Sequence, residues 1–328
     1  MSNILVVGSL NADLVVRAPR FPRPGETISG DDLQVIPGGK GANQAVAAAR
    51  LGANVSMLGR VGRDSFSDFL LDNLKGNKVD TTLVQRDDAA TGTAIIVVDA
   101  NGQNSIVLSP GANGQVSTAD IESASFHNFD LLLLKLEIPI PTVLRAVQRA
   151  KENNARVILN PAPAKELSGE LIALADFIIP NESELSLLTG MEVKGIPSVE
   201  VASRALLQRG AKNVIVTLGS KGALIVNTET STQVDTYRVE VVDTTAAGDA
   251  FIGGFATKLL ESDSLLSNMQ EHTLTGTRAP ALQNAVKFAC VCGALAVTKF
   301  GAQPSLPTRE EVERFMSLRG GALSLRSV

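Results

Sequence analysis

The sequence is poor in the residues that build disulfide and zinc scaffolds, and in large aromatic rings. Its 328 residues include two cysteines, two histidines, one tyrosine and no tryptophan. Cys290 and Cys292 are too few for a disulfide framework and are not spaced as a CxxC pair, which indicates a reducing compartment. Because only His127 and His272 stand beside them, the composition argues against a zinc site.

Charge and hydropathy also lack extremes. There are 30 lysines and arginines against 34 aspartates and glutamates, with no long run of either sign, which argues against nucleic acid or an anionic membrane as partner. The chain starts without a signal-peptide pattern, and no apolar run approaches the roughly 20 residues of a membrane helix. We therefore expect a cytoplasmic protein whose partner is a small molecule.

Short β-branched runs alternate with longer stretches rich in alanine and leucine. This alternation predicts an α/β fold with a Rossmann-like, largely parallel central sheet flanked by helices, within one domain of residues 1–328. The predicted strands are residues 4–7, 55–58, 131–134, 157–159, 177–179 and 214–218. The predicted helices are residues 42–51, 65–75, 143–152, 182–188, 199–209, 249–260 and 283–299.

Four extended segments do not fit a parallel β-α-β succession. They are residues 13–16, 26–35, 93–98 and 104–108. Prolines in residues 17–25 forbid a helix interior between the first two, and Asn101-Gly102 is a strong hairpin signal between the last two. We predict a small separate β-sheet, built from residues 12–36 and 92–109, that acts as a lid or an interface.

Two segments near the carboxyl end are expected to lie outside both predicted sheets and their helices. Residues 262–280 are rich in polar residues, glycine and proline, which predicts a surface insertion between two helices. Residues 319–328 are expected to be a frayed tail.

The usual phosphate-binding motifs are absent. The P-loop pattern GxxxxGK[ST] fails because Gly41, rather than serine or threonine, follows Lys40. The GxGxxG fingerprint of dinucleotide-binding proteins fails because Gly8 is followed by Ser9-Leu10-Asn11. These absences argue against a P-loop NTPase and a nicotinamide-dependent dehydrogenase.

The segment that most strongly indicates chemistry is residues 241–251, VVDTTAAGDAF, where a strand leads through small residues into a helix. Small side chains let the backbone amides at a helix start approach a ligand, and the helix dipole favours an anion there. Asp249, in the first turn, could then take a proton from a hydroxyl that attacks a bound phosphorus. From the residues alone, an ordinary helix cap is the alternative.

Two further segments suit a polyhydroxy ligand. In residues 37–44, PGGKGANQ, three glycines allow close backbone approach, while Lys40 and Asn43 can form hydrogen bonds; a plain tight turn is the alternative. Residues 11–13, NAD, lie just past the carboxyl end of the first strand, where open α/β sheets bind ligands. Asparagine and aspartate also form ordinary turns, so that interpretation stays open.

Two more strand ends suit a nucleotide. Residues 181–184, NESE, and 217–222, TLGSKG, each follow a predicted strand. Glycines and hydroxyl groups there suit phosphates, and a carboxylate such as Glu184 suits hydrated Mg²⁺.

Together these motifs resemble a known family. Residues 38–43 and 243–251 resemble the two signatures of the ribokinase-like, or PfkB, carbohydrate kinases, and the resemblance spans about residues 3–315. Within that family the ribokinase branch is the most similar, on the evidence of residues 11–13, 160–163, 181–184, 217–222 and 301–305. The resemblance implies ATP-dependent phosphorylation of D-ribose at the 5-hydroxyl, which gives D-ribose 5-phosphate and ADP.

The resemblance also implies roles for the matching residues. Asp249 would be the catalytic base, and the anion hole would consist of Ala246, Ala247, Gly248 and Asp249. The sugar would be held by Asn11, Ala12, Asp13, Gly39, Lys40, Gly41, Ala42, Asn43, Glu137 and Asp249. ATP would be contacted by Asn181, Thr217, Leu218, Gly219, Ser220, Lys221, Gly222, Gly248, Asp249 and Cys290.

Mg²⁺ and a monovalent cation, usually K⁺, are implied as cofactors. Glu184 would organise hydrated Mg²⁺. The positions that match the K⁺ site, several of them through main-chain carbonyls, are Asp243, Thr245, Ala296, Lys299, Gly301 and Ser305. The small sheet would cover the sugar and build a homodimer. Ala246 departs from the glycine usual in the wider family, although ribokinases often have alanine there.

Other functions stay open. A kinase of the same fold could act on another sugar or a nucleoside, such as fructose, a keto-deoxy sugar acid or adenosine. A non-catalytic sugar-binding regulator is a further alternative, against which the intact Gly248-Asp249 pair argues.

Overall fold

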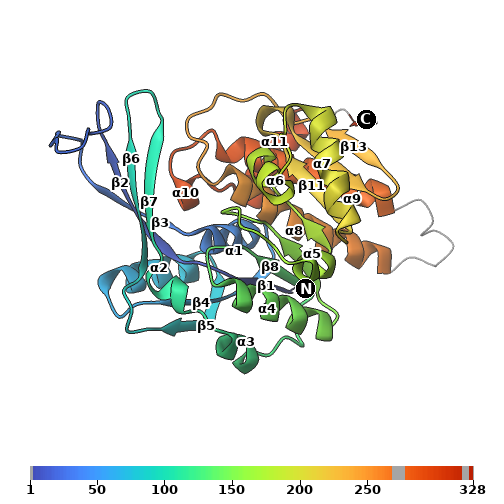
Figure 1. The fold of residues 1–328 in the computed structure, drawn as a ribbon, viewed down its shortest axis with the longest axis horizontal. Helices are drawn as coiled ribbons and strands as arrows, with labels where there is room; N and C mark the ends of the chain where they lie inside the picture. The colour runs from blue at the N-terminus through green and yellow to red at the C-terminus, as the bar shows by residue number, and fades with distance from the viewer. Residues whose placement is uncertain (1–2, 268–277, 320–324, 328) are drawn as a thin grey trace.

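The computed structural model describes residues 3–267, 278–319 and 325–327 (Figure 1). A ten-stranded sheet runs in the order β14-β13-β12-β11-β10-β9-β8-β1-β4-β5. Its strands are β1 (Asn3–Val7), β4 (Asn54–Val61), β5 (Val79–Arg86), β8 (Leu131–Leu134), β9 (Arg156–Leu159), β10 (Phe177–Ile178), β11 (Asn213–Thr217), β12 (Ala223–Asn227), β13 (Ser231–Val234) and β14 (Leu325–Ser327). Neighbours from β5 to β11 are parallel, which confirms the predicted largely parallel sheet.

Helices cover both faces of this sheet, because alternate strand side chains point to opposite faces. In β1, Ile4 and Val6 join a core with one helix layer, whereas Leu5 and Val7 join a core with the other. The first layer contains α1 (Lys40–Arg50), α2 (Ser65–Gly76), α8 (Ala247–Ser267), α9 (Arg278–Ala296) and α11 (Arg309–Leu318). The second contains α3 (Thr118–Ser123), α4 (Ile140–Glu152), α5 (Gly169–Leu174), α6 (Glu182–Thr189) and α7 (Ile196–Gln208).

A separate four-stranded sheet stands to one side of the main body (Figure 1). Its order is β3 (Gln34–Gly38), β2 (Asn11–Arg17), β6 (Gly92–Val98) and β7 (Asn104–Ser109). The β6–β7 hairpin is antiparallel, as Asn101-Gly102 predicts. This confirms that a small second sheet exists beside the large one.

The predicted second strand of that sheet was misplaced. Pairing occurs over 34–38 rather than 26–35, because Glu26 closes a local turn instead of extending. Its carboxylate accepts a hydrogen bond from the backbone N–H of Arg23 at 2.9 Å and forms an ion pair with Arg20. Pro37 is accommodated because β3 is an edge strand.

The carboxyl-terminal predictions need correction as well. Strands β12 and β13 were not predicted, and residues 325–327, expected to fray, pair with β13 as an antiparallel edge strand. The expected insertion of 262–280 is shorter, since α8 continues to Ser267 and α9 starts at Arg278. Residues 268–277 lie outside the described part of the chain.

Helix α9 bears on the expectation that no segment is apolar enough to span a membrane. Its segment Ala279–Ala296 meets the length and composition of a membrane-spanning helix, with a mean hydropathy of 1.2. Half of this segment is buried, and Val286, Ala289 and Cys292 lie in the core that α9 shares with α8. We therefore interpret α9 as a core helix.

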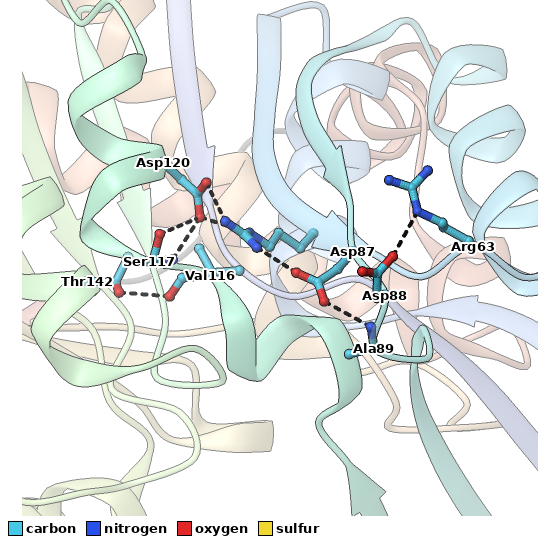
Figure 2. A network of polar contacts seen from close by, with 9 residues as sticks. Arg63, Asp87, Asp88, Ala89, Val116, Ser117, Asp120 and Thr142 are labelled. Carbon is cyan, nitrogen blue, oxygen red and sulfur yellow. Dashed lines mark hydrogen bonds and ion pairs between the residues drawn. The ribbon is translucent and has the colours of Figure 1, made fainter.

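Ion pairs to Asp87 and Asp120 hold the connection between β5 and β6 against the main body (Figure 2). Both carboxylates accept from the guanidinium of Arg60 in β4, Asp120 at 2.8 and 2.9 Å and Asp87 at 2.5 Å. Asp120 also caps α3 by accepting from the backbone N–H of Ser117, and Asp87 accepts from the N–H of Ala89. Because Asp87 and Ala89 lie on the connection between β5 and β6, this network holds the chain shortly before β6 begins.

Candidate active site

Several of the predicted site residues follow the carboxyl ends of parallel strands, and others lie at the starts of helices. Asn11 and Asp13 lie at the start of β2, which follows β1 after residues 8–10, while Glu137 follows β8. Glycine-rich residues 38–41 lead into α1, and residues 243–248 lead into α8. Crossover connections of parallel strands gather such segments at one edge, where open α/β sheets bind ligands.

Asp249 occupies the centre of this edge. It lies in the first turn of α8 and is 6% exposed. Its Oδ2 accepts a hydrogen bond from Asn43 Nδ2 at 2.9 Å. Its Oδ1 accepts from Lys135 Nζ at 2.6 Å and from Gln44 Nε2 at 3.2 Å. Burial opposes the charge of Asp249, but the ammonium groups of Lys135 and Lys40 hold the pKa of its carboxyl below the usual range.

The turn before α8 has the backbone expected of an anion hole. Ala246 adopts a left-handed conformation with φ 58°, which turns the chain into the helix. A Cβ on Gly248 would meet no heavy atom within 4 Å, so the space in front of that residue is open. Backbone amides at the start of a 21-residue helix therefore border open space beside the Asp249 carboxylate.

The glycines before α1 are required by close packing. A Cβ on Gly38 would overlap the carboxylate of Asp13, and Gly39, at φ 86°, lies against the backbone of Ser9 and Asn11. Lys40 is directed into the site, because its ammonium interacts with the carboxylates of Asp249 and Glu137.

Asp13 lies among like charges. Burial and the neighbouring carboxylates Glu137 and Asp249 raise the pKa of Asp13 from 3.8 to about 7, against an opposing effect of Lys40. For Lys40, burial opposes the charge, but Asp249 and Glu137 prevail and raise the pKa. This edge of the large sheet thus carries carboxylates and an ammonium group side by side. A polyhydroxy ligand could donate hydrogen bonds to the carboxylates and accept one from the ammonium.

Buried polar side chains support these residues. Glu137 accepts hydrogen bonds from the Ser9 hydroxyl and from the backbone N–H of Lys40, the latter at 3.0 Å. Asn11 Oδ1 accepts from Asn113 Nδ2 at 2.7 Å. The Asn113 amide also accepts from the backbone N–H of Leu10 and donates to the carbonyl of Leu10. These partners fix the direction of both predicted sugar-side groups.

The predicted nucleotide side lies at the ends of β10 and β11. Asn181 caps α6 by accepting from Glu184 N–H at 2.8 Å, and Glu184 Oε2 accepts from Asn181 N–H at 2.9 Å. Glu184 faces the same edge. Burial raises the pKa of its carboxyl, and this effect outweighs the opposing charges of Lys40 and Lys135. Residues 219–221 form a 3-10 turn after β11, where Ser220 and Lys221 are exposed.

Four predicted site residues contribute little side-chain surface. Ala42, Leu218, Cys290 and Ala296 lie in the two hydrophobic cores. Burial raises the pKa of the Cys290 thiol to about 12, so the thiol stays protonated and can line the nucleotide side only as an apolar group, not as a nucleophile. Ala12 is buried in β2, between Pro37 of β3 and Thr93 of β6.

Three of the predicted cation residues meet beside the turn into α8. Asp243 Oδ1 accepts from the N–H and hydroxyl of Thr245 at 2.9 and 2.7 Å, and its Oδ2 accepts from Gly301 N–H at 2.9 Å. Gly301 precedes α10 (Ala302–Ser305), which ends at the buried Ser305. The Lys299 side chain instead forms an ion pair with Glu311 at 2.5 Å, so only its main chain could serve such a site.

Comparisons with known proteins show the family of the chain. The family model described as "pfkB family carbohydrate kinase" matches residues 1–309.

The chain belongs to the pfkB family of carbohydrate kinases.

Within the pfkB family, several relatives match almost the whole chain. The ribokinase of Haemophilus influenzae is 41% identical over 95% of this chain and 98% of its own length. The deoxyribokinase of Salmonella typhimurium is 39% identical over 96% of this chain and 99% of its own length. The structure of Arabidopsis thaliana ribokinase complexed with ribose and ATP is 33% identical, covers 96% of this chain and 99% of its own, and has a TM-score of 0.84.

Sequence reasoning missed several polar residues of this candidate site. The most important are Lys135, Gln44 and Asn113, which hold Asp249 and Asn11 by side-chain hydrogen bonds. Lys135 had a detectable signal, because it is a single charge inside the apolar run LLLLKL of residues 131–136. Lysine is almost never fully buried without a partner.

Proposed function

We propose that this chain catalyses the ATP-dependent phosphorylation of D-ribose at the 5-hydroxyl. The observation that carries the proposal is the buried Asp249 carboxylate at the start of α8, flanked by Lys40 and Asn43 and by open space at Gly248. Relatives named ribokinase that match nearly the whole chain support ribose as the substrate. A ribokinase structure with ribose and ATP has the same fold.

In the proposed mechanism, the residues before α1 and after β1 hold the sugar. Asp13 accepts hydrogen bonds from ribose hydroxyls, while Lys40 and Asn43 orient the ring toward Asp249. Asp249 takes the proton from the ribose 5-hydroxyl as the oxygen of that hydroxyl attacks the γ-phosphorus of ATP in line, with ADP as the leaving group. The amides of residues 246–249 stabilise the charge on the transferring phosphoryl group, which should matter at least as much for the rate as removal of the proton.

Glu184 would hold Mg²⁺ through a water molecule. Its Oε2 is used by the α6 cap, which leaves Oε1 for that contact. Hydrated Mg²⁺ bound through a single carboxylate and substrate phosphates fits this donor. The ion would neutralise charge on the phosphates of ATP.

A monovalent cation, K⁺, is proposed beside the anion hole. Asp243 accepts from Thr245 and Gly301 there, and carboxylate, hydroxyl and main-chain oxygens suit a hard cation. Arg50 braces the segment by donating to the carbonyls of Gln303 and Leu306 at 2.8 and 2.7 Å.

We also propose a cytoplasmic homodimer that pairs through the small sheet. One face of that sheet exposes aliphatic side chains, among them Ile95 (50% exposed) and its cross-strand neighbour Val107 (64%). Contiguous apolar surface of this kind is characteristic of interaction sites, and a second copy of the same sheet is our proposed occupant. The two buried, free cysteines fit a reducing compartment.

Another sugar is the second candidate substrate. It is favoured by relatives named deoxyribokinase at 39% identity and by a Vibrio cholerae fructokinase structure at 28% identity. Purified protein assayed for ADP release with D-ribose, 2-deoxyribose, D-fructose and adenosine, each with and without K⁺, separates these substrates. We expect the highest kcat/KM with ribose and stimulation by K⁺; a clear preference for deoxyribose, fructose or adenosine would contradict the substrate assignment.

A further inference from the structure

Lys135 is a buried lysine to which the proposed mechanism gives no role. It directly follows β8 and is 1% exposed. A buried ammonium is strongly destabilising unless it is paired and hydrogen-bonded, so such a group points to its partner. That partner is the Asp249 carboxylate, at 2.6 Å, which lies 114 residues away in the chain.

The hydrogen bonds on Asp249 are distributed unevenly between its two oxygens. Lys135 Nζ and Gln44 Nε2 both donate to Oδ1, whereas Asn43 Nδ2 alone, among the described side chains, donates to Oδ2. Each oxygen of an ionised carboxylate has about two lone-pair sites. Oδ1 is therefore saturated by protein donors, and Oδ2 retains one site for a hydroxyl proton.

The donors on Oδ1 are themselves anchored. Lys135 Nζ also donates to Asn160 Oδ1 at 3.0 Å, and Asn160 Nδ2 donates to the carbonyl of Ile179 at 2.7 Å. This chain of contacts ties Lys135 to the ends of β9 and β10. Gln44 lies in the first helix layer and is fully buried, so the carboxylate is held from two sides.

We propose that Lys135 is a positioning residue for catalysis: together with Gln44 it occupies Asp249 Oδ1, keeps the carboxylate ionised and leaves Oδ2 as the oxygen that receives the sugar proton. This proposal rests on the proposed function of Asp249 as base. It assigns to Lys135 both a geometric and an electrostatic contribution.

The surrounding charges make the electrostatic contribution testable. Besides Lys135, the charged groups that face Asp249 are Lys40 from α1, Asp13 from β2 and the carboxylates of Glu137 and Glu184. Within the described part of the chain, removal of Lys135 would leave Lys40 as the one cation acting against burial and three carboxylates. The Asp249 carboxyl would then become protonated at higher pH.

The experiment compares three variants of the full-length protein. Lys135→Met removes the charge and the donor, and Lys135→Gln removes the charge but keeps a donor. Lys151→Met is the matched control, because Lys151 forms an ion pair with Asp176, which directly precedes β10 at the opposite, amino-terminal edge of the sheet. For each, kcat and KM for ribose are measured across pH, with ribose binding measured by calorimetry.

We expect Lys135→Met to lower kcat at neutral pH by about tenfold or more while the ribose Kd changes by less than about threefold. The acid limb of its pH profile should move upward by about one pH unit or more. Lys135→Gln should recover part of kcat but retain the shifted acid limb. Lys151→Met should match the wild-type profile.

Two results would overturn the proposal. One is a Lys135→Met enzyme whose folded fraction retains the wild-type kcat and pH profile, because Lys135 would then serve only packing. The other is a shift of the acid limb in Lys151→Met equal to that in Lys135→Met. If Lys135→Met does not fold, the profile of Lys135→Gln decides, since its acid limb must still move.

The proposed function fails separately. It would fail if wild-type protein released no ADP in response to ribose, or if Asp249→Asn retained turnover. An active wild type, an inactive Asp249→Asn and an unshifted Lys135→Gln would leave the function intact and remove only the role of Lys135.

Discussion

Asp13→Asn is expected to change stability in a way that depends on pH. Asp13 is 8% exposed and lies near the carboxylates of Glu137 and Asp249. Burial and these carboxylates raise its pKa from 3.8 to about 7. The folded protein therefore keeps a proton between about pH 4 and pH 7 that the unfolded chain releases.

The sign and size of the effect follow from proton linkage. Because the folded pKa is raised, the stabilising contribution is present at low pH and is lost as pH rises through about 7. At about pH 5 the proton contributes about 2.5 kcal/mol, and at about pH 8 it contributes almost nothing. Asparagine does not titrate, so the stability of Asp13→Asn relative to wild type should rise by about 2.5 kcal/mol between these two values.

Urea unfolding at both pH values, without ribose, measures this difference. Asp32→Asn is the control, because Asp32 is an exposed carboxylate on the connection between β2 and β3. It should show no comparable change. If wild type and Asp13→Asn differed by the same free energy at both pH values, the raised pKa of Asp13 would be refuted. The same variant should bind ribose more weakly, since the substituted side chain presents an amide in place of the accepting carboxylate.

Three further predictions concern single residues. The free energy of unfolding of Ala246→Gly, measured in urea, should equal that of wild type or exceed it by up to about 1 kcal/mol, because φ 58° is strained for alanine. Ala246→Val should lower both the free energy of unfolding and the turnover. Val107→Glu should halve the mass seen by light scattering if the small sheet builds the dimer; an unchanged mass would place the interface elsewhere. Glu184→Gln should raise the Mg²⁺ concentration for half-maximal activity by about tenfold, and an unchanged Mg²⁺ dependence would confine Glu184 to the α6 cap.

The sequence predicted the central architecture because its signals there are local. Residues 131–134, four consecutive leucines, form a strand buried on both faces, and Asn181 and Glu184 form a capping box at the start of the helix predicted for residues 182–188. It failed where an open strand edge or a side-chain contact, rather than the hydrophobic pattern, decides the pairing. Residues 325–327 form a strand only because β13 offers an open edge, and Glu26 turns back because Arg20 and Arg23 bind its carboxylate.

The same distinction applies to the candidate site. The motifs of residues 38–43 and 243–251 are contiguous, so the sequence located both turns and Asp249. The side chains that hold these residues are remote: Asn113 is 102 residues from Asn11, and Lys135 is 114 residues from Asp249. No periodicity connects such pairs, and only packing brings them together.

The central claim is that Asp249 is the base for phosphoryl transfer to ribose. The most direct test measures turnover of Asp249→Asn with ribose and ATP, together with its ribose Kd by calorimetry. We predict a loss of turnover of about 10²–10⁴-fold with a ribose Kd close to that of wild type. Turnover equal to wild type would contradict the account and reduce Asp249 to a cap of α8.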